Sequence, residues 1–332
     1  MTAGTAPRES LVRGRGVEVF VRERGEGRPV LMINGLGGNL EMWGTTEERL
    51  ARGSRTITFD APGTGRSPTQ LWPMTISSLA ELATNLLDEL GYERVDVLGF
   101  SLGGLVAQQL AHRAPARVRR MVLAATACGW GSMPGTLEAL WVMAMPLRYH
   151  SRLLYRRTSS LLGPADAALL RREPSLVEAR FGHPPQTASY LAYLWAAALW
   201  SSLPWLPSLH TPTLVLQGEG DELVPPANGL QLARHLPQSR VHILEDEGHL
   251  FVYDPDSAAL PLLDDFFSAP TLEDSVAWTS GGIVHDDATV EAAFAVSIGA
   301  TPHRELSALY RRFVRYAYHD NGFNGNGHSA RA

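Results

Sequence analysis

Short apolar runs alternate with segments of helical periodicity over most of the chain, and this alternation limits the folds that the chain can adopt. The apolar runs expected to be strands are 29–33, 55–59, 95–98, 120–125, 213–217 and 240–244, and 17–22, where apolar and polar residues alternate, is expected to be a half-buried strand. Helices are expected at 79–90, 102–112 and 230–235. Continuous apolar runs are typical of strands buried on both faces, and parallel strands need helical crossovers between them. The pattern therefore predicts an α/β fold with a mostly parallel, doubly wound sheet.

The alternation stops after residue 128 and resumes at residue 209. Residues 129–208 are rich in Leu, Trp, Met, Arg and Pro and show helical spacing without strand runs. We therefore expect an α/β core made of residues 15–128 and 209–268, with residues 129–208 inserted between them as a helical cap.

The two ends of the chain differ from this core. Residues 1–15 are expected to be a frayed leader. Residues 269–318 are a predicted C-terminal extension, in which 304–317 carries apolar residues at i, i+3, i+4 and i+7 with Arg on the opposite face. This helix is expected to dock on the main domain or on a second copy of the chain, as a homodimer; the alternative is that it binds an anionic membrane or granule surface. Residues 319–332 are predicted to be a disordered tail.

Composition excludes several classes of protein. Of 332 residues, 45% are hydrophobic and 19% are charged, which excludes a disordered chain. The net charge of −5 provides no field for binding nucleic acid. The single cysteine, Cys128, excludes an internal disulfide and is expected to be a buried packing residue. Because the sequence contains neither a membrane-spanning apolar run nor the apolar part of a signal peptide, we expect a cytoplasmic protein.

The sequence G-F-S-L-G, residues 99–103, follows one predicted strand and precedes one predicted helix. This context is typical of a nucleophile elbow, a tight turn that holds a serine hydroxyl clear of the sheet at a helix N-terminus. Small residues must flank such a turn, and Gly99 and Gly103 are suited to this. The simpler alternative is a serine that only caps the helix. We predict Ser101 as a nucleophile.

A serine hydroxyl needs a base, and in this type of fold the acid and the histidine follow the serine in the order Ser, Asp or Glu, His. Asp221 follows the predicted strand 213–217, and His249 follows the predicted strand 240–244. Both therefore lie at carboxyl ends of strands, where the active sites of open α/β sheets are found. The rival carboxylates Glu219, Glu222 and Asp246 are expected to be solvated charges.

The loop N-G-L-G-G, residues 34–38, follows the predicted strand 29–33. An oxyanion hole needs two backbone N–H groups, one from the residue after the nucleophile and one from a loop of this kind. We predict Leu102 and Leu36 as the donors, with Gly35 as the next candidate, and Asn34 as a brace for the loop that borders the substrate. Taken alone, Asn34-Gly35 is also compatible with a plain turn.

Together these motifs resemble the α/β-hydrolase superfamily. The similar segments are N-G-L-G-G-N (34–39), D-A-P-G-T-G-R-S (60–67), G-F-S-L-G-G (99–104), G-E-G-D-E-L-V-P (218–225) and E-G-H (247–249), in that order. Within the superfamily, the chain is similar to the intracellular medium-chain-length polyhydroxyalkanoate depolymerases. That similarity includes L-A-A-T-A (123–127), M-P-G (133–135), L-W-V-M-A-M-P-L-R-Y (140–149), T-P-T-L-V-L-Q-G (211–218) and E-G-H-L-F (247–251).

The resemblance covers about residues 15–268 and implies the α/β-hydrolase fold, with the cap inserted after the sixth strand. It also implies Ser101, Asp221 and His249 as the catalytic triad, with Leu102 in the oxyanion position. These depolymerases commonly have Trp after the nucleophile, whereas this chain has Leu102.

The predicted function is hydrolysis of a lipophilic carboxylic ester by a serine acyl-enzyme: a medium-chain acyl ester, a hydroxyalkanoate oligomer or a lactone. The cap residues expected to line its pocket are Trp141, Met143, Met145 and Trp195. No metal-ligand spacing occurs, and acyl transfer by these residues needs no cofactor. Two alternatives stay open: a tailoring enzyme of secondary metabolism that releases, cyclises or lactonises an acyl chain, and a non-catalytic binding protein with a hydrolase fold.

Overall fold

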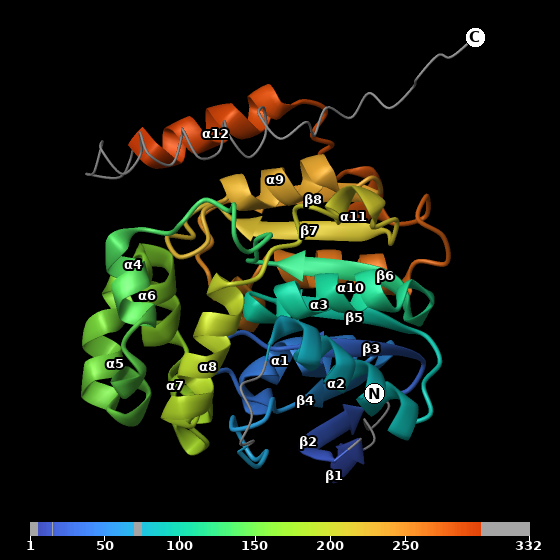
Figure 1. Cartoon of the computed structure of the whole chain (residues 1–332), viewed down its shortest axis with the longest axis vertical. Helices are drawn as coiled ribbons and strands as arrows, with labels where there is room; N and C mark the ends of the chain where they lie inside the picture. The colour runs from blue at the N-terminus through green and yellow to red at the C-terminus, as the bar shows by residue number, and fades with distance from the viewer. Residues whose placement is uncertain (1–5, 15, 70–74, 300–332) are drawn as a thin grey trace.

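The computed structural model describes residues 6–14, 16–69 and 75–299, and within them the chain forms one eight-stranded sheet (Figure 1). The strands are β1 (Arg8–Gly14), β2 (Val17–Arg24), β3 (Arg28–Ile33), β4 (Ser54–Phe59), β5 (Val95–Phe100), β6 (Val118–Ala124), β7 (Thr213–Gly218) and β8 (Ser239–Leu244). Their order across the sheet is β1-β2-β4-β3-β5-β6-β7-β8. The β1–β2 and β2–β4 pairs are antiparallel and the other pairs are parallel, which confirms the predicted fold class.

Helices cover both faces of this sheet. The helices outside the cap are α1 (Gly44–Leu50), α2 (Ile76–Glu89), α3 (Leu102–Arg113), α9 (Ala227–His235), α10 (Ala259–Ser268), α11 (Val276–Thr279) and α12 (Asp287–Gly299). Successive strand residues face opposite cores: Leu31 packs with the side chains of α2 and α3, whereas Met32 packs with those of α10. Burial on both faces explains why the parallel strands read as continuous apolar runs.

The chain between β6 and β7 forms a helical cap at one end of the sheet (Figure 1). Its α-helices are α4 (Leu137–Met143), α5 (Arg152–Ser159), α6 (Pro164–Arg172), α7 (Pro174–Gly182) and α8 (Thr187–Ala198), and its 3-10 helices are η3 (Pro146–His150), η4 (Ser160–Leu162) and η5 (Leu206–Ser208). Tyr193 on α8 and Tyr190 one turn earlier are fully buried against the main domain, so the cap is packed onto the core rather than hinged away from it. None of the described helices is long and apolar enough to cross a bilayer.

The structure corrects the expectation of a frayed leader, because Arg8–Gly14 forms β1. This edge strand pairs with β2 along its whole length, from Arg8 opposite Glu23 to Gly14 opposite Val17. It contributes few apolar side chains and is held by its backbone ladder and by ion pairs such as that between Glu9 and Arg22.

The C-terminal extension begins as a cover for the other edge of the sheet. Gly282 exchanges two backbone hydrogen bonds with Val241 of β8, and α12 then packs on α9 through Val290 and Phe294. Pairing or covering an edge strand removes a site at which another chain could add. The predicted helix at 304–317 and the predicted tail at 319–332 lie outside the described residues.

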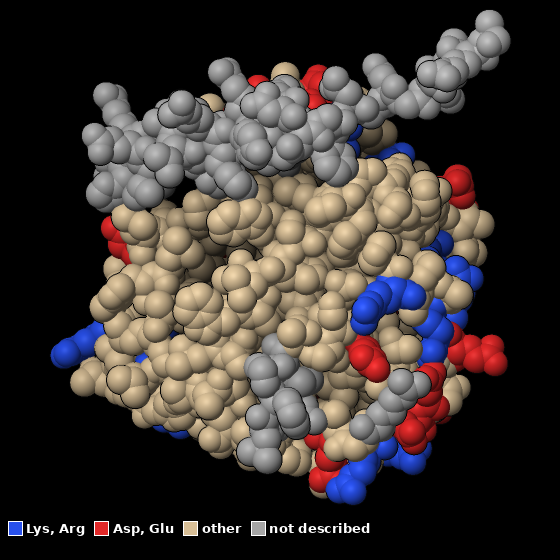
Figure 2. Space-filling model, viewed as in Figure 1, with Lys and Arg blue, Asp and Glu red and all other residues tan. Residues whose placement is uncertain are grey.

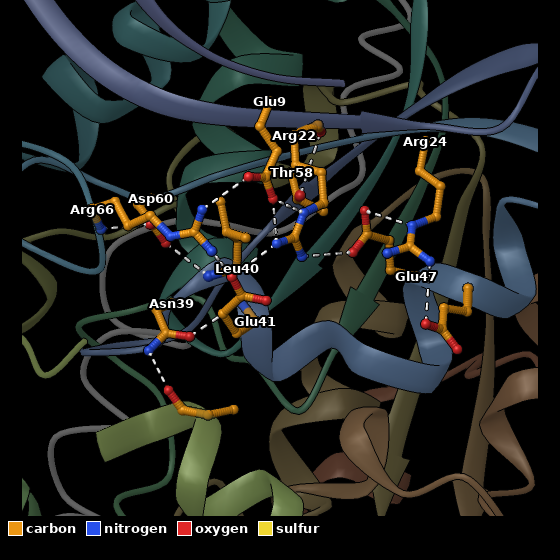
Figure 3. A network of polar contacts seen from close by, with 12 residues as sticks. Glu9, Arg22, Arg24, Asn39, Leu40, Glu41, Glu47, Thr58, Asp60 and Arg66 are labelled. Atoms are coloured by element: carbon orange, nitrogen blue, oxygen red, sulfur yellow. Dashed lines mark hydrogen bonds and ion pairs between the residues drawn. The ribbon is translucent and has the colours of Figure 1, made fainter. Parts of the chain in front are cut away.

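A polar network fixes the segment that follows β3 (Figure 3). Arg22 binds Glu9 and Glu41, and the buried carboxylate of Asp60 accepts the backbone N–H groups of Leu40 and Arg66, both at 2.7 Å. At the adjacent residue, the side-chain amide of Asn39 donates to the carbonyl oxygen of Ala179 on α7, at 2.9 Å. The network thus ties the loop after β3 to the sheet on one side and to the cap on the other.

Candidate active site

Ser101 lies in the turn between β5 and α3 with φ 52° and ψ −118°. A positive φ is strained for a residue with a side chain, and such strain is typical of functional turns. The backbone around Ser101 holds the turn in place: its N–H donates to the carbonyl of Ala124 at 2.9 Å, and the Thr126 hydroxyl donates to its carbonyl at 2.7 Å. The turn therefore matches the predicted nucleophile elbow.

The glycines that flank this turn allow α3 to lie directly against the strands. A Cβ atom on Gly103 would lie 2.0 Å from the carbonyl oxygen of Ile33 at the end of β3. A Cβ atom on Gly99 would lie 2.6 Å from the carbonyl oxygen of Gly103 and 2.7 Å from Cβ of Ala107. Neither position has room for a side chain, which is why the sequence requires glycine on both sides of Ser101.

Three side chains predicted from the sequence meet at the carboxyl end of the sheet. Nε2 of His249 lies 3.1 Å from Oγ of Ser101, and Nδ1 of His249 lies 2.8 Å from Oδ2 of Asp221. An ionised carboxylate can only accept hydrogen bonds, so Nδ1 carries the proton and Nε2 can accept the proton of the Ser101 hydroxyl. This arrangement allows a histidine base to activate a serine nucleophile.

The carboxylate of Asp221 is buried and satisfied on both oxygens. Oδ1 accepts the backbone N–H groups of Leu223 at 2.9 Å and Val224 at 2.7 Å, and Oδ2 accepts the Gln217 amide at 3.1 Å in addition to His249. Of the three rival carboxylates, Glu219 and Asp246 are exposed and Glu222 is half-buried. Asp221 is the carboxylate that the structure brings to His249.

His249 is buried with this carboxylate beside it. Burial lowers the pKa of the imidazole, but the charge of Asp221 and its hydrogen bond outweigh that effect and raise the pKa above its ordinary value. The imidazolium that forms when the ring takes a proton is therefore stabilised by Asp221.

The loop after β3 lies over the nucleophile, because a Cβ atom on Gly35 would lie 3.2 Å from Cβ of Ser101. Asn34 braces this loop: its amide donates to the carbonyl of Asn39 at 2.7 Å, and its Oδ1 accepts the N–H of Gly35 at 2.9 Å and the hydroxyl of Tyr253. Since the N–H of Gly35 already has this partner, Leu36 remains the better candidate donor from this loop, together with Leu102 at the N-terminus of α3.

Sequence reasoning missed Asp166, a buried carboxylate on α6 of the cap. Its Oδ2 accepts the backbone N–H of His249 at 3.0 Å, and its Oδ1 accepts that of Leu250 at 2.7 Å. Gly248 leaves the space for this contact, since a Cβ atom there would lie 2.7 Å from Oδ1 of Asp166. Burial raises the pKa of Asp166 to about 7. Helical periodicity identifies the cap helices but not which polar side chain reaches the main domain.

A narrow cavity of about 30 Å³ lies beside Ser101 and His249. Of the four cap residues predicted to line it, only Met143 does so. Trp141 and Trp195 are exposed, at 58% and 65%, and Met145 is half-buried away from it. The sequence did not indicate that Arg148 and Arg180 also line the cavity, and both are buried.

The single cysteine and the possible metal ligands also bear on the chemistry of the site. Cys128 is fully buried, and burial raises the pKa of its thiol to about 12, so it is a packing residue rather than a nucleophile. Within residues 6–14, 16–69 and 75–299, no three His, Cys, Asp or Glu side chains are arranged to hold a metal ion.

Comparison with known proteins agrees with this geometry. Residues 28–256 match the alpha/beta hydrolase fold family. A poly(3-hydroxyalkanoate) depolymerase from Ectopseudomonas oleovorans is 38% identical over 242 residues, which are 72% of this chain and 83% of that protein.

Solved structures show the same fold. The meta-cleavage product hydrolase of Pseudomonas fluorescens IP01 is 24% identical with a TM-score of 0.68, over 79% of this chain and 98% of that chain. The enol-lactonase of Burkholderia xenovorans LB400 is 27% identical with a TM-score of 0.64, over 77% of this chain and 99% of that chain. The names of these relatives are those of a depolymerase, a hydrolase and a lactonase, consistent with an ester-acting enzyme, and the expected resemblance to the depolymerases is confirmed. The chain therefore belongs to the alpha/beta hydrolase fold family.

Proposed function

We propose that this protein is a serine hydrolase that cleaves a lipophilic carboxylic ester through an acyl-enzyme. The observation that carries the proposal is the hydrogen-bonded series from Asp221 through His249 to Ser101, with distances of 2.8 and 3.1 Å. Three groups that occur together at the carboxyl end of the sheet support the proposal. They are a buried carboxylate, an imidazole of raised pKa and a hydroxyl on a strained turn.

In the first half of the reaction, Nε2 of His249 takes the proton of the Ser101 hydroxyl as Oγ attacks the ester carbonyl carbon. Asp221 holds the imidazole in the required tautomer and stabilises its positive charge. The negative charge that develops on the carbonyl oxygen is held by the backbone N–H groups of Leu102 and Leu36, and each such donor contributes about 10²–10³ in rate.

In the second half, His249 donates its proton to the leaving alcohol as the bond between the carbonyl carbon and that oxygen breaks. Water then attacks the acyl-enzyme, with His249 as the base, and releases the acid and the free Ser101 hydroxyl. Nucleophile, base and oxyanion donors all come from the chain, so the proposed reaction requires no cofactor.

The substrate class follows from the cap and from the relatives. Few charged side chains lie over the cap and α8 on the face shown in Figure 2, and charges gather instead over the β1–β2 edge. The relatives include a poly(3-hydroxyalkanoate) depolymerase and an enol-lactonase. Medium-chain acyl esters, hydroxyalkanoate oligomers and lactones all fit this setting. Because the cavity is narrow, at about 30 Å³, we expect cap side chains to move when an ester enters.

The test is hydrolysis of p-nitrophenyl acyl esters from acetyl to palmitoyl, with wild type and Ser101→Ala. Turnover with an optimum near the octanoyl ester that disappears in Ser101→Ala is the expected result. Mass spectrometry of products from ω-hydroxyacyl esters separates release of the free acid from lactonisation, the alternative that uses the same acyl-enzyme. A folded wild type that turns over no ester and is not labelled by a fluorophosphonate at Ser101 would contradict the proposal and favour a binding role.

A further inference from the structure

Arg148 and Arg180 form a pair of buried guanidinium groups in the cap, beside the cavity that holds Ser101 and His249. Arg148 is 1% exposed and Arg180 is 6% exposed, and both line that cavity. They stack on the same two rings: Arg148 lies 5.4 Å from the ring of Tyr149 and 4.6 Å from that of Tyr155, and Arg180 lies 5.1 and 5.7 Å from them.

Several guanidinium nitrogens of Arg148 and Arg180 have no hydrogen-bond partner. Nε and Nη2 of Arg148 and Nε of Arg180 are buried without a hydrogen-bond partner, whereas Nη1 of Arg180 donates to the carbonyl of Gly37 at 3.3 Å. The ion pairs that cap arginines form in the described part of the chain belong to Arg152 and Arg172 and include neither Arg148 nor Arg180. Buried cations are expected to be paired with an anion, because removing an unpaired charge from water is strongly unfavourable.

Stacking on tyrosine rings compensates only part of this charge. Burial raises the pKa of the Tyr149 phenol, but the two guanidinium groups outweigh that effect and lower the pKa. Arg180 also acts on His249, where its charge opposes protonation of the imidazole. The positive potential of Arg180 therefore extends to the reacting groups.

Resting on the proposed function, we infer that Arg148 and Arg180 bind a carboxylate of the substrate itself, so that the ester cleaved at Ser101 bears a free acid group. A carboxylate is planar and accepts two hydrogen bonds from one guanidinium group, which suits the unpartnered N–H groups here. The carboxyl-terminal unit of a hydroxyalkanoate oligomer has this chemistry. Cleavage of its last ester bond acylates Ser101 and releases a hydroxy acid, whose new hydroxyl takes the proton from His249.

The experiment compares two substrates that differ only in this charge: the linear dimer of 3-hydroxyoctanoate and the methyl ester of its terminal carboxyl group. For wild type, kcat/KM for the free acid is expected to exceed that for the methyl ester by about 10- to 100-fold, the range of one hydrogen bond to a charged group. Arg148→Gln and Arg180→Gln should each bring this ratio toward one. Arg157→Gln, which changes an exposed cap arginine, should leave the ratio unchanged.

A binding measurement keeps the inference testable without turnover. Calorimetric titration with 3-hydroxyoctanoate should show binding to wild type, about tenfold or more weaker binding to Arg180→Gln, and no comparable binding of methyl 3-hydroxyoctanoate. If wild type hydrolyses neutral p-nitrophenyl esters but shows no preference for the acid dimer and binds the acid and its methyl ester alike, the inference is wrong and the proposed function stands. If no ester is hydrolysed although the acid binds through Arg180, the proposed function is wrong and the pair is an anion site of a binding protein.

Discussion

Asp166 on the cap accepts the backbone N–H of His249, the predicted base, at 3.0 Å, although the two residues are 83 positions apart in the sequence. The same carboxylate holds the N–H of Leu250 at 2.7 Å. A cap helix thus fixes the loop from which the imidazole reaches Ser101. The cap is therefore part of the scaffold of the site as well as its cover.

We expect Asp166→Ala to lower kcat/KM for a p-nitrophenyl ester by about 10- to 100-fold, because small displacements of a reacting group have costs of this size. Asp166→Asn keeps one acceptor oxygen and should recover part of the loss, which a purely structural defect would not predict. Glu178→Ala, which removes an exposed cap carboxylate, is the control. Steady-state kinetics on all three variants checks this, and equal activities of Asp166→Ala and wild type would contradict a positioning role.

The pKa of Asp166 predicts a change of stability with pH. Burial raises this pKa from 3.8 to about 7, so the folded chain binds the proton more tightly than the unfolded chain does. The resulting stabilisation is complete below pH of about 4 and is lost as the pH rises through about 7. Residue 166 cannot titrate in Asp166→Asn. The free energy of unfolding of this variant minus that of wild type should therefore increase as the pH rises over this window. Urea unfolding at several pH values measures this difference. The pH dependence contributed by titratable groups that both proteins share cancels from it. A difference that falls as the pH rises through this window would refute the assignment.

The parallel strands could be predicted because burial on both faces produces continuous apolar runs. The strands in turn indicate the three polar side chains at their ends, those of Ser101, Asp221 and His249. Position after such a run then identifies residues such as Ser101 and His249. β1 could not be predicted in this way, since an edge strand held by backbone pairing and by Glu9–Arg22 contacts has little apolar pattern. The same holds for α12, whose sequence is apolar on several sides and so lacks a clear helical stripe.

The cap shows a different limit. Spacing along a helix indicates which residues share a face, but the docking of the whole cap on the core decides which face meets the site. Trp141 and Trp195 were expected at the cavity and are exposed, whereas Arg148 and Asp166 are buried next to the site. Such charged residues are seldom buried unless they have a partner, so the sequence favours the surface for both.

Asp221→Asn tests the role of the carboxylate beside His249. Asn would donate toward Nδ1 and stabilise the wrong imidazole tautomer, a change that lowers kcat by about 10⁴ in Ser-His-Asp proteases. The charge of Asp221 helps to raise the pKa of His249. A protonated imidazole cannot act as the base, so kcat/KM falls at low pH. This fall should occur at lower pH in the variant than in wild type. Kinetics from about pH 5 to 9 measures both effects. Glu219→Gln, an exposed change on the same loop, is expected to behave like wild type, and a loss of less than tenfold in Asp221→Asn would argue against the proposed mechanism.

The close approach of α3 to β3 predicts that Gly103 tolerates no side chain. In Gly103→Ala, the added Cβ would meet the carbonyl oxygen of Ile33 at 2.0 Å, and this neighbour is sheet backbone that cannot move alone. The turn at Ser101 must then shift, so we expect a loss of about 1–3 kcal/mol or more in the free energy of unfolding, together with a marked loss of ester hydrolysis. Gly53→Ala is the matched control, since a Cβ there meets nothing within 4 Å. Urea unfolding and ester kinetics on both variants measure the contrast. A Gly103→Ala protein as stable and active as Gly53→Ala would show that the elbow is not packed as tightly as its geometry requires.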